Sequence, residues 1–107
     1  MTLRAASLAE IEIIKACILI AQEKGVLTAR GDNGEECWGR SVYEDSGLRV
    51  DSTLTFYKPV VGFFELRVEE NGILVFAASG SIDIASFSAT QVSVHVPGDW
   101  VRRVFAK

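Results

Sequence analysis

The chain has 107 residues, of which 49% are hydrophobic and 23% are charged, and its formal net charge is -3. This length and composition suit one globular domain over residues 1–107, with enough apolar side chains for a core that needs no disulfide, metal or other cofactor. The acidic balance disfavours nucleic acids and anionic membrane surfaces as partners, because both are bound mainly through clustered Lys and Arg side chains.

The first predicted element is an amphipathic helix from Ser7 to Lys24. Ser7 and Glu10 have the spacing of a capping box, in which each side chain accepts a hydrogen bond from the backbone amide of the other residue. Gly25 is expected to end the helix in a left-handed conformation. The apolar stripe that should face the core consists of Ile11, Ile14, Cys17, Ile18 and Ala21.

The same segment is expected to be neither a secretory signal peptide nor a membrane helix, because charged residues interrupt its apolar run. The two cysteines, Cys17 and Cys37, have neither a metal-ligand spacing nor a CxxC spacing, which fits reduced thiols. Together these features predict a cytoplasmic protein.

A polar, glycine-bearing segment over residues 28–36 follows the helix and is predicted to be a loop. Its carboxylates belong to Asp32, Glu35 and Glu36, which together suggest a metal site as one interpretation. Their spacing differs from that of an EF-hand loop, where oxygen ligands alternate over about 12 residues. The segment is therefore interpreted as a solvated loop, and no metal is predicted.

Alternating apolar and polar residues predict strands through the rest of the chain. The clearest alternation runs from Leu48 to Tyr57 and predicts a strand with one wet face. The fold class is therefore α+β, with the N-terminal helix packed on a strongly bent antiparallel sheet of about six strands, and barrel closure is left open. The predicted strands cover residues 37–43, 48–57, 60–70, 73–78, 91–96 and 100–105.

The most informative strand pairing is the hairpin around Asn71-Gly72. Asn and Gly tolerate the positive φ angles of a type I′ turn better than other residues, so the two flanking runs should pair. Counting outward from this turn sets four pairs opposite each other: Glu70 with Ile73, Val68 with Val75, Arg67 with Phe76, and Phe63 with Gly80.

This register places apolar side chains on both faces of the hairpin. One apolar face suffices for a core, so the second must be covered by a partner, a ligand or more of the chain. We therefore expect a non-catalytic binding or assembly domain that forms a homodimer, with aromatic anchors in the interface. The expected interface residues are Val61, Phe63, Leu74 and Phe76.

An alternative function is a small-molecule or catalytic pocket between the helix and the sheet, near Trp38, His95 and Trp100. Acidic residues at its rim would favour a small apolar or cationic ligand. His95 is the one histidine of the chain. Asp99 is the closest acid, and no convincing acid or nucleophile partner stands near His95 in sequence, so no catalytic residue is predicted. A third interpretation, from net charge alone, is an acidic inhibitor of a basic protein.

Hydrolase, metalloprotease, P-loop and dinucleotide-binding motifs are absent from the sequence. The runs YEDSGLRVDSTLTFY and GFFELRVEENG resemble small bacterial domains, including proteins encoded on mobile gene cassettes. This resemblance covers about half of the chain and implies no functional residue.

Overall fold

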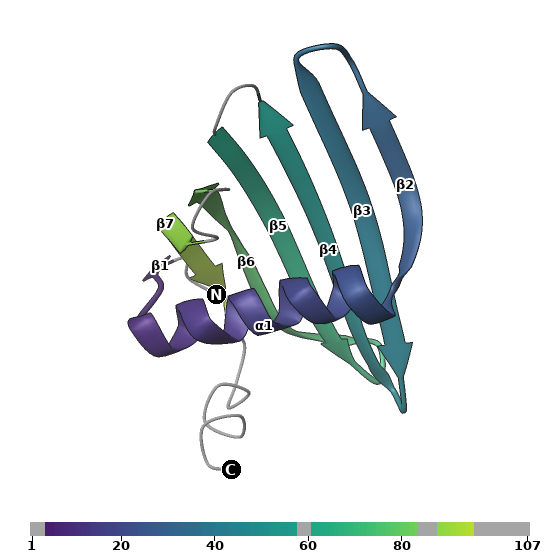
Figure 1. Ribbon diagram of the computed structural model, residues 1–107. Coiled ribbons are helices and arrows are strands. Elements are labelled where there is room, and N and C mark those ends of the chain that lie inside the picture. The colour runs from purple at the N-terminus through teal and green to yellow at the C-terminus, as the bar shows by residue number, and fades with distance from the viewer. Residues whose placement is uncertain (1–3, 58–60, 84–87, 96–107) are drawn as a thin grey trace.

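A computed structural model describes residues 4–57, 61–83 and 88–95. Figure 1 shows helix α1 lying across one face of a twisted antiparallel sheet. The elements are β1 (Arg4–Ala5), α1 (Leu8–Lys24), β2 (Val26–Asp32), β3 (Glu36–Asp45), β4 (Leu48–Tyr57), β5 (Val61–Glu70), β6 (Ile73–Asp83) and β7 (Ser88–His95).

The sheet is a meander in which each strand from β2 to β7 pairs with the next one along the chain, and β1 adds to β7 at the edge. Within the described residues β2 pairs only with β3 and β1 only with β7, so the sheet is open and does not close into a barrel. The predicted α+β fold, one helix on a six-stranded antiparallel sheet, is confirmed.

The start of α1 is the predicted capping box. Ser7 Oγ accepts a hydrogen bond from the Glu10 amide at 3.2 Å, and Glu10 Oε1 accepts one from the Ser7 amide at 3.0 Å. These two bonds satisfy backbone donors that have no partner within the helix, and such a cap contributes about 1 kcal/mol.

The left-handed stop expected at Gly25 is wrong. Gly25 has φ -80° and ψ 173°, which is extended backbone, and its amide donates to the Ala21 carbonyl oxygen at 3.1 Å. A Cβ atom added at Gly25 would lie 2.8 Å from the carbonyl oxygen of Val42 in β3. Glycine therefore serves a different purpose here, because it lets the end of the helix approach the β3 backbone.

The core lies between α1 and the sheet face that it covers, which we call the helix-facing surface. Ile14, Ile18 and Ala21 of α1 are buried there, as the helical periodicity predicts. Each fully buried Ile, Leu or Phe side chain contributes roughly 1.5–3 kcal/mol relative to an exposed one. The sheet supplies Val50, Leu54, Phe64, Leu66, Val68, Val75, Phe76, Ala78 and Val94.

The loop predicted over residues 28–36 is wrong. Strand β2 occupies Val26–Asp32 and pairs antiparallel with β3, and only residues 33–35 connect the two strands. Most side chains of β2 are exposed, so its sequence lacks an apolar alternation. Backbone pairing to β3 overrides the polar composition, as is common for an edge strand.

The hairpin register is right at the turn and wrong beyond it. Asn71 and Gly72 have φ angles of 52° and 81°, and Glu70 pairs with Ile73, as predicted. A β-bulge between Val68 and Glu69 then shifts the register by one residue. The observed pairs are Val68 with Phe76, Arg67 with Ala77, Phe64 with Gly80, and Phe63 with Ser81.

This shift moves Phe76 to the other face of the sheet, because a one-residue slip in a strand exchanges its two faces. Phe76 is 0% exposed and belongs to the core. Its assignment to the second apolar face, and hence to an interface, is therefore wrong. Phe63 stays on the opposite face, which we call the outer surface, and is 47% exposed.

The predicted strand over residues 91–96 is present as part of β7. The predicted turn at 58–59, the turn at 97–99 and the last predicted strand, 100–105, lie outside the described residues. In the part of the chain that the structure describes, α1 is too short and too polar to cross a bilayer.

Replacing Phe76 tests the corrected register. We expect Phe76→Ala to lower the free energy of unfolding by about 3–5 kcal/mol, since it empties a fully buried site. Phe63→Ala is the matched control on the outer surface and should lower it by less than about 1.5 kcal/mol. Urea unfolding followed by circular dichroism measures both, and equal losses would contradict the register.

Candidate functional site

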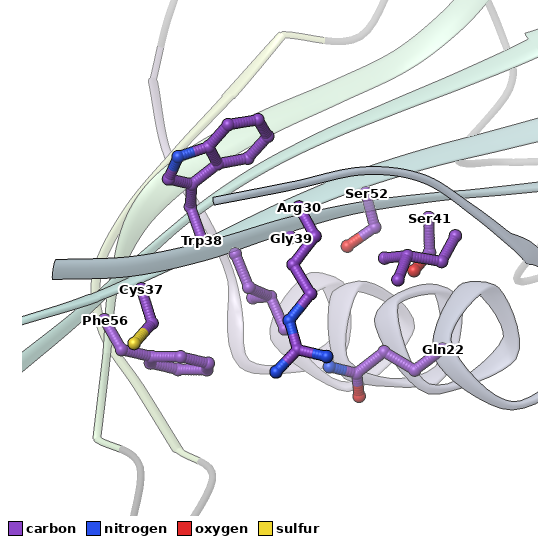
Figure 2. Close-up of a pocket in the computed structure, with 10 residues that line it drawn as sticks. Gln22, Arg30, Cys37, Trp38, Gly39, Ser41, Ser52 and Phe56 are labelled. Carbon is purple, nitrogen blue, oxygen red and sulfur yellow. The ribbon is translucent and has the colours of Figure 1, made fainter. Parts of the chain in front are cut away.

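A cavity of about 280 Å³ lies between the C-terminal half of α1 and the helix-facing surface of β2, β3 and β4 (Figure 2). This volume is near the lower end of the range of small-molecule sites, roughly 300–1,000 Å³. The lining residues are Gln22, Leu27, Arg30, Cys37, Trp38, Gly39, Ser41, Ser52, Leu54 and Phe56.

Small side chains on β3 account for the cavity. Three β3 residues on the helix side line the cavity, Cys37, Gly39 and Ser41, and they pair with residues 56, 54 and 52 of β4. On β5, two strands away, the corresponding positions carry the larger Phe64 and Leu66, which fill the core. A Cβ at Gly39 would contact only Leu27 Cδ1, at 3.7 Å, so the space above this glycine is open.

The deepest polar group of the cavity is the Ser52 hydroxyl. Ser52 is 1% exposed, and its Oγ atom has no hydrogen-bond partner among the described residues. Figure 2 shows the Ser52 and Ser41 side chains on the side of the sheet that faces the helix. A buried hydroxyl without a partner destabilises a protein by about 1–3 kcal/mol.

The mouth of the cavity carries a positive charge. Arg30 pairs with Gly39 across β2 and β3, and Figure 2 shows its guanidinium extending towards Gln22 of α1. Arg30 is exposed and makes no ion pair with the residues that the structure describes. Its five N–H donors are therefore available to an acceptor at the mouth.

Apolar side chains form the rest of the wall. Phe56 and Cys37 point to the helix side of the sheet, close together in Figure 2. Leu54 and Leu27 complete this apolar wall. The cavity thus combines an apolar wall with two separated polar positions, the Ser52 hydroxyl inside and the Arg30 guanidinium at the mouth.

Of the sequence-predicted pocket residues, Trp38 and His95 are described and do not lie together. Trp38 lines the cavity at its edge, but its indole points away from the helix and lies over Gly31, where an added Cβ would collide with the ring. His95 pairs with Ala77 on β7, and strands β6, β5 and β4 separate it from Trp38 on β3. Trp100 lies outside the described residues.

The remaining interface residues are spread over the outer surface. Leu74 is half-buried and pairs with Glu69, while Phe63 pairs with Thr55 and Ser81. The side chain of Val61 lies outside the described ones. Without Phe76, the predicted interface has one exposed aromatic ring among its described residues.

Asp32 is the last residue of β2, and its carboxylate bonds the turn that follows. Asp32 Oδ1 accepts a hydrogen bond from the Gly34 amide at 3.0 Å, which shapes the turn into β3. Across the described residues, no group of three or more His, Cys, Asp or Glu side chains is arranged to hold a metal ion.

Sequence reasoning missed both polar positions of the cavity. Ser52 stands between Val50 and Leu54 on the apolar face of a clean alternation, and a hydroxyl at such a position is a signal that could have been followed. Arg30 was missed because its segment was interpreted as a loop. The pairing of β2 with β3 places it on the helix-facing surface.

The thiol of Cys17 provides a test of the packing between α1 and the sheet. Burial raises the pKa of Cys17 from 9.0 to about 11. At pH 8 the folded chain should therefore hold about a hundredfold less Cys17 thiolate than the unfolded chain. Since the folded state favours the neutral thiol, its contribution to stability is present below pH 9.0 and is lost as pH rises towards about 11.

The measurement uses Cys37→Ala, which leaves Cys17 as the one thiol of the chain. We expect alkylation by iodoacetamide at pH 8 to be much slower in the folded protein than in urea. Cys17→Ser is the matched variant and reports Cys37, which lines the cavity. Equal alkylation rates for Cys17 in the folded and unfolded protein would contradict its burial.

No family model, curated protein or solved structure matches the chain significantly.

Proposed function

We propose that this protein is a non-catalytic binding domain that holds a small molecule in the cavity between α1 and strands β2–β4. The observation that carries the proposal is the Ser52 hydroxyl, which is buried in this cavity without a hydrogen-bond partner among the described residues. A ligand atom that bonds this hydroxyl would remove the cost of its burial, and that gain favours the bound state.

The composition of the wall also supports a binding site. Small-molecule sites are concave and mostly apolar, with a few polar groups that fix the orientation of the ligand. Here Leu54 and Phe56 supply apolar surface, while Ser52 and Arg30 supply hydrogen bonds at different depths. Gly39 keeps the space between them open.

Binding is favoured over reaction because of the side chains at the wall. Cys37 is the nucleophile-type residue of the cavity, and the described lining residues include no histidine or carboxylate that could activate its thiol. The hydroxyls of Ser41 and Ser52 likewise lack a base among the described lining residues. Binding a ligand requires neither an activated nucleophile nor a base.

Filling the cavity tests the proposal. Gly39→Leu places a side chain in open space, so we expect the variant to fold and to lose small-molecule binding. Ser79→Leu, at an exposed position on β6, is the matched control and should bind as the wild type does. Native mass spectrometry of freshly purified protein, followed by a fragment screen by ligand-observed NMR, measures binding.

The cavity would be supported as the site if the wild type and Ser79→Leu retain a ligand or bind fragments and Gly39→Leu does neither. Binding that persists in Gly39→Leu would place the site elsewhere. A wild-type protein that neither carries a ligand nor binds any fragment would contradict the proposed function.

A homodimer through the outer surface is a second candidate, favoured by the 47% exposure of Phe63. Desolvated aromatic side chains dominate many such interfaces. We expect Phe63→Glu to shift a dimer towards monomer, because dimerisation would bury the new charge. Analytical ultracentrifugation measures the mass, with Arg67→Gln as the control on the same strand. A monomeric wild type, or a dimer that survives Phe63→Glu, would contradict this candidate.

A further inference from the structure

We infer that the cavity is built for a small apolar carboxylate, with the carboxylate at Arg30, the apolar body against Phe56 and Leu54, and a second polar atom at Ser52. This inference rests on the proposed function and adds the chemical class of the ligand. It replaces the cationic ligand that was expected from acidic residues at the rim of the pocket.

The charge of the ligand follows from Arg30. Arg40 donates to Asp51 from Nε at 2.9 Å and also from Nη2, and this hydrogen bond raises the pKa of Arg40. Arg49 lies within 4 Å of Glu44 and Asp51, and Arg67 lies 3.9 Å from Glu69. Among the arginine side chains that the structure describes, Arg30 alone has no carboxylate at such a distance.

A carboxylate is the group that suits this position. The planar guanidinium of arginine matches the two oxygens of a carboxylate and bonds them with two parallel N–H donors. The described lining residues include Arg30 and no acidic side chain, so a cation would meet repulsion at the mouth. The amide of Gln22, towards which Arg30 extends, adds neutral donors and acceptors beside it.

The body of the ligand follows from the wall beyond Arg30. Phe56 and Leu54 face the helix from β4, and Leu27 approaches from β2. Apolar atoms gain roughly 25 cal/mol for each Å² of surface that such a wall removes from water. The volume of about 280 Å³ restricts the ligand to a compact molecule, such as one substituted aromatic ring.

The second polar atom follows from Ser52. Its hydroxyl is the most deeply buried polar atom of the wall and has no partner among the described residues. A hydroxyl can both donate and accept a hydrogen bond, so a ligand hydroxyl would satisfy it. The inferred ligand therefore has polar groups at both ends and an apolar middle.

Three probes that share a 4-hydroxyphenyl ring and differ in the end group test the inference: 4-hydroxyphenylacetate, 4-hydroxyphenylacetamide and tyramine. Each is titrated into the full chain while backbone amide signals of β2–β4 are followed by NMR. Molecules of this size are expected to bind in the millimolar range. We expect the carboxylate to bind about three- to tenfold more tightly than the amide, and tyramine to bind weakest.

Arg30→Gln should remove the preference for the carboxylate and leave binding of the amide within about twofold, because it removes only the charged contact. Arg67→Gln changes the net charge equally on the outer surface and should keep the preference. Added salt should weaken binding of the carboxylate in the wild type, since the contact lies at an exposed mouth.

Ser52→Ala tests the inner contact. We expect weaker binding of 4-hydroxyphenylacetate, by about threefold or more, and unchanged binding of phenylacetate, which lacks the ring hydroxyl. The melting temperature of the free variant should equal or exceed that of the wild type, because the change removes a buried polar group without a partner among the described residues. Ser79→Ala is the control for both measurements.

Equal affinities for the three probes, or a carboxylate preference that survives Arg30→Gln, would overturn the inference and leave a neutral binding cavity intact. A failure to detect binding of any of the three probes would also overturn the inference. The proposed function is then decided separately by native mass spectrometry of the wild type against Gly39→Leu, which detects a retained molecule of any charge.

Discussion

The packing of α1 against the helix-facing surface is the interaction on which the rest of the structure depends. An open sheet of this kind has two faces, and only burial of one of them supplies a core. Ile14, Ile18 and Ala21 provide that burial, and Gly25 lets the helix end approach β3 closely enough for the packing to reach the sheet edge. The capping box at Ser7 fixes where the helix starts, and hence which side chains form the stripe.

The cavity exists because this packing is uneven along the helix. Where α1 lies over β5, large side chains such as Phe64 and Leu66 meet it and the core is filled. Where its C-terminal half lies over β3, the small residues Cys37, Gly39 and Ser41 line the cavity. Protein interiors are normally close-packed, and an internal cavity lowers stability. A binding function would explain why small residues leave this cavity unfilled.

How much could be predicted from the sequence depended on the range of the interaction. The capping box, the burial of Ile14, Ile18 and Ala21 in the helical stripe, and the strand over residues 48–57 follow from local spacing and are confirmed. The bulge at Val68 does not follow from local spacing, because the registers with and without the bulge have similar patterns of apolar and polar pairs. The register with the bulge is the one that buries Phe76 fully. The β2 edge strand depends on backbone bonds to β3, which composition does not encode.

The candidate site depends on both kinds of information, a local pattern at Ser52 and a long-range strand pairing at Arg30. Ser52 breaks the apolar pattern of β4 on the core face, and conflicts between a local pattern and a fold concentrate at functional positions. Arg30 can be assigned to the site only from the pairing of β2 with β3, which directs its side chain towards α1. A buried hydroxyl without a partner among the described residues lowers the stability of the free protein, and alanine at the same position would avoid that cost. The Ser52 hydroxyl inside the cavity and the Arg30 guanidinium at its mouth are the two polar positions on which the proposal of a bound molecule rests.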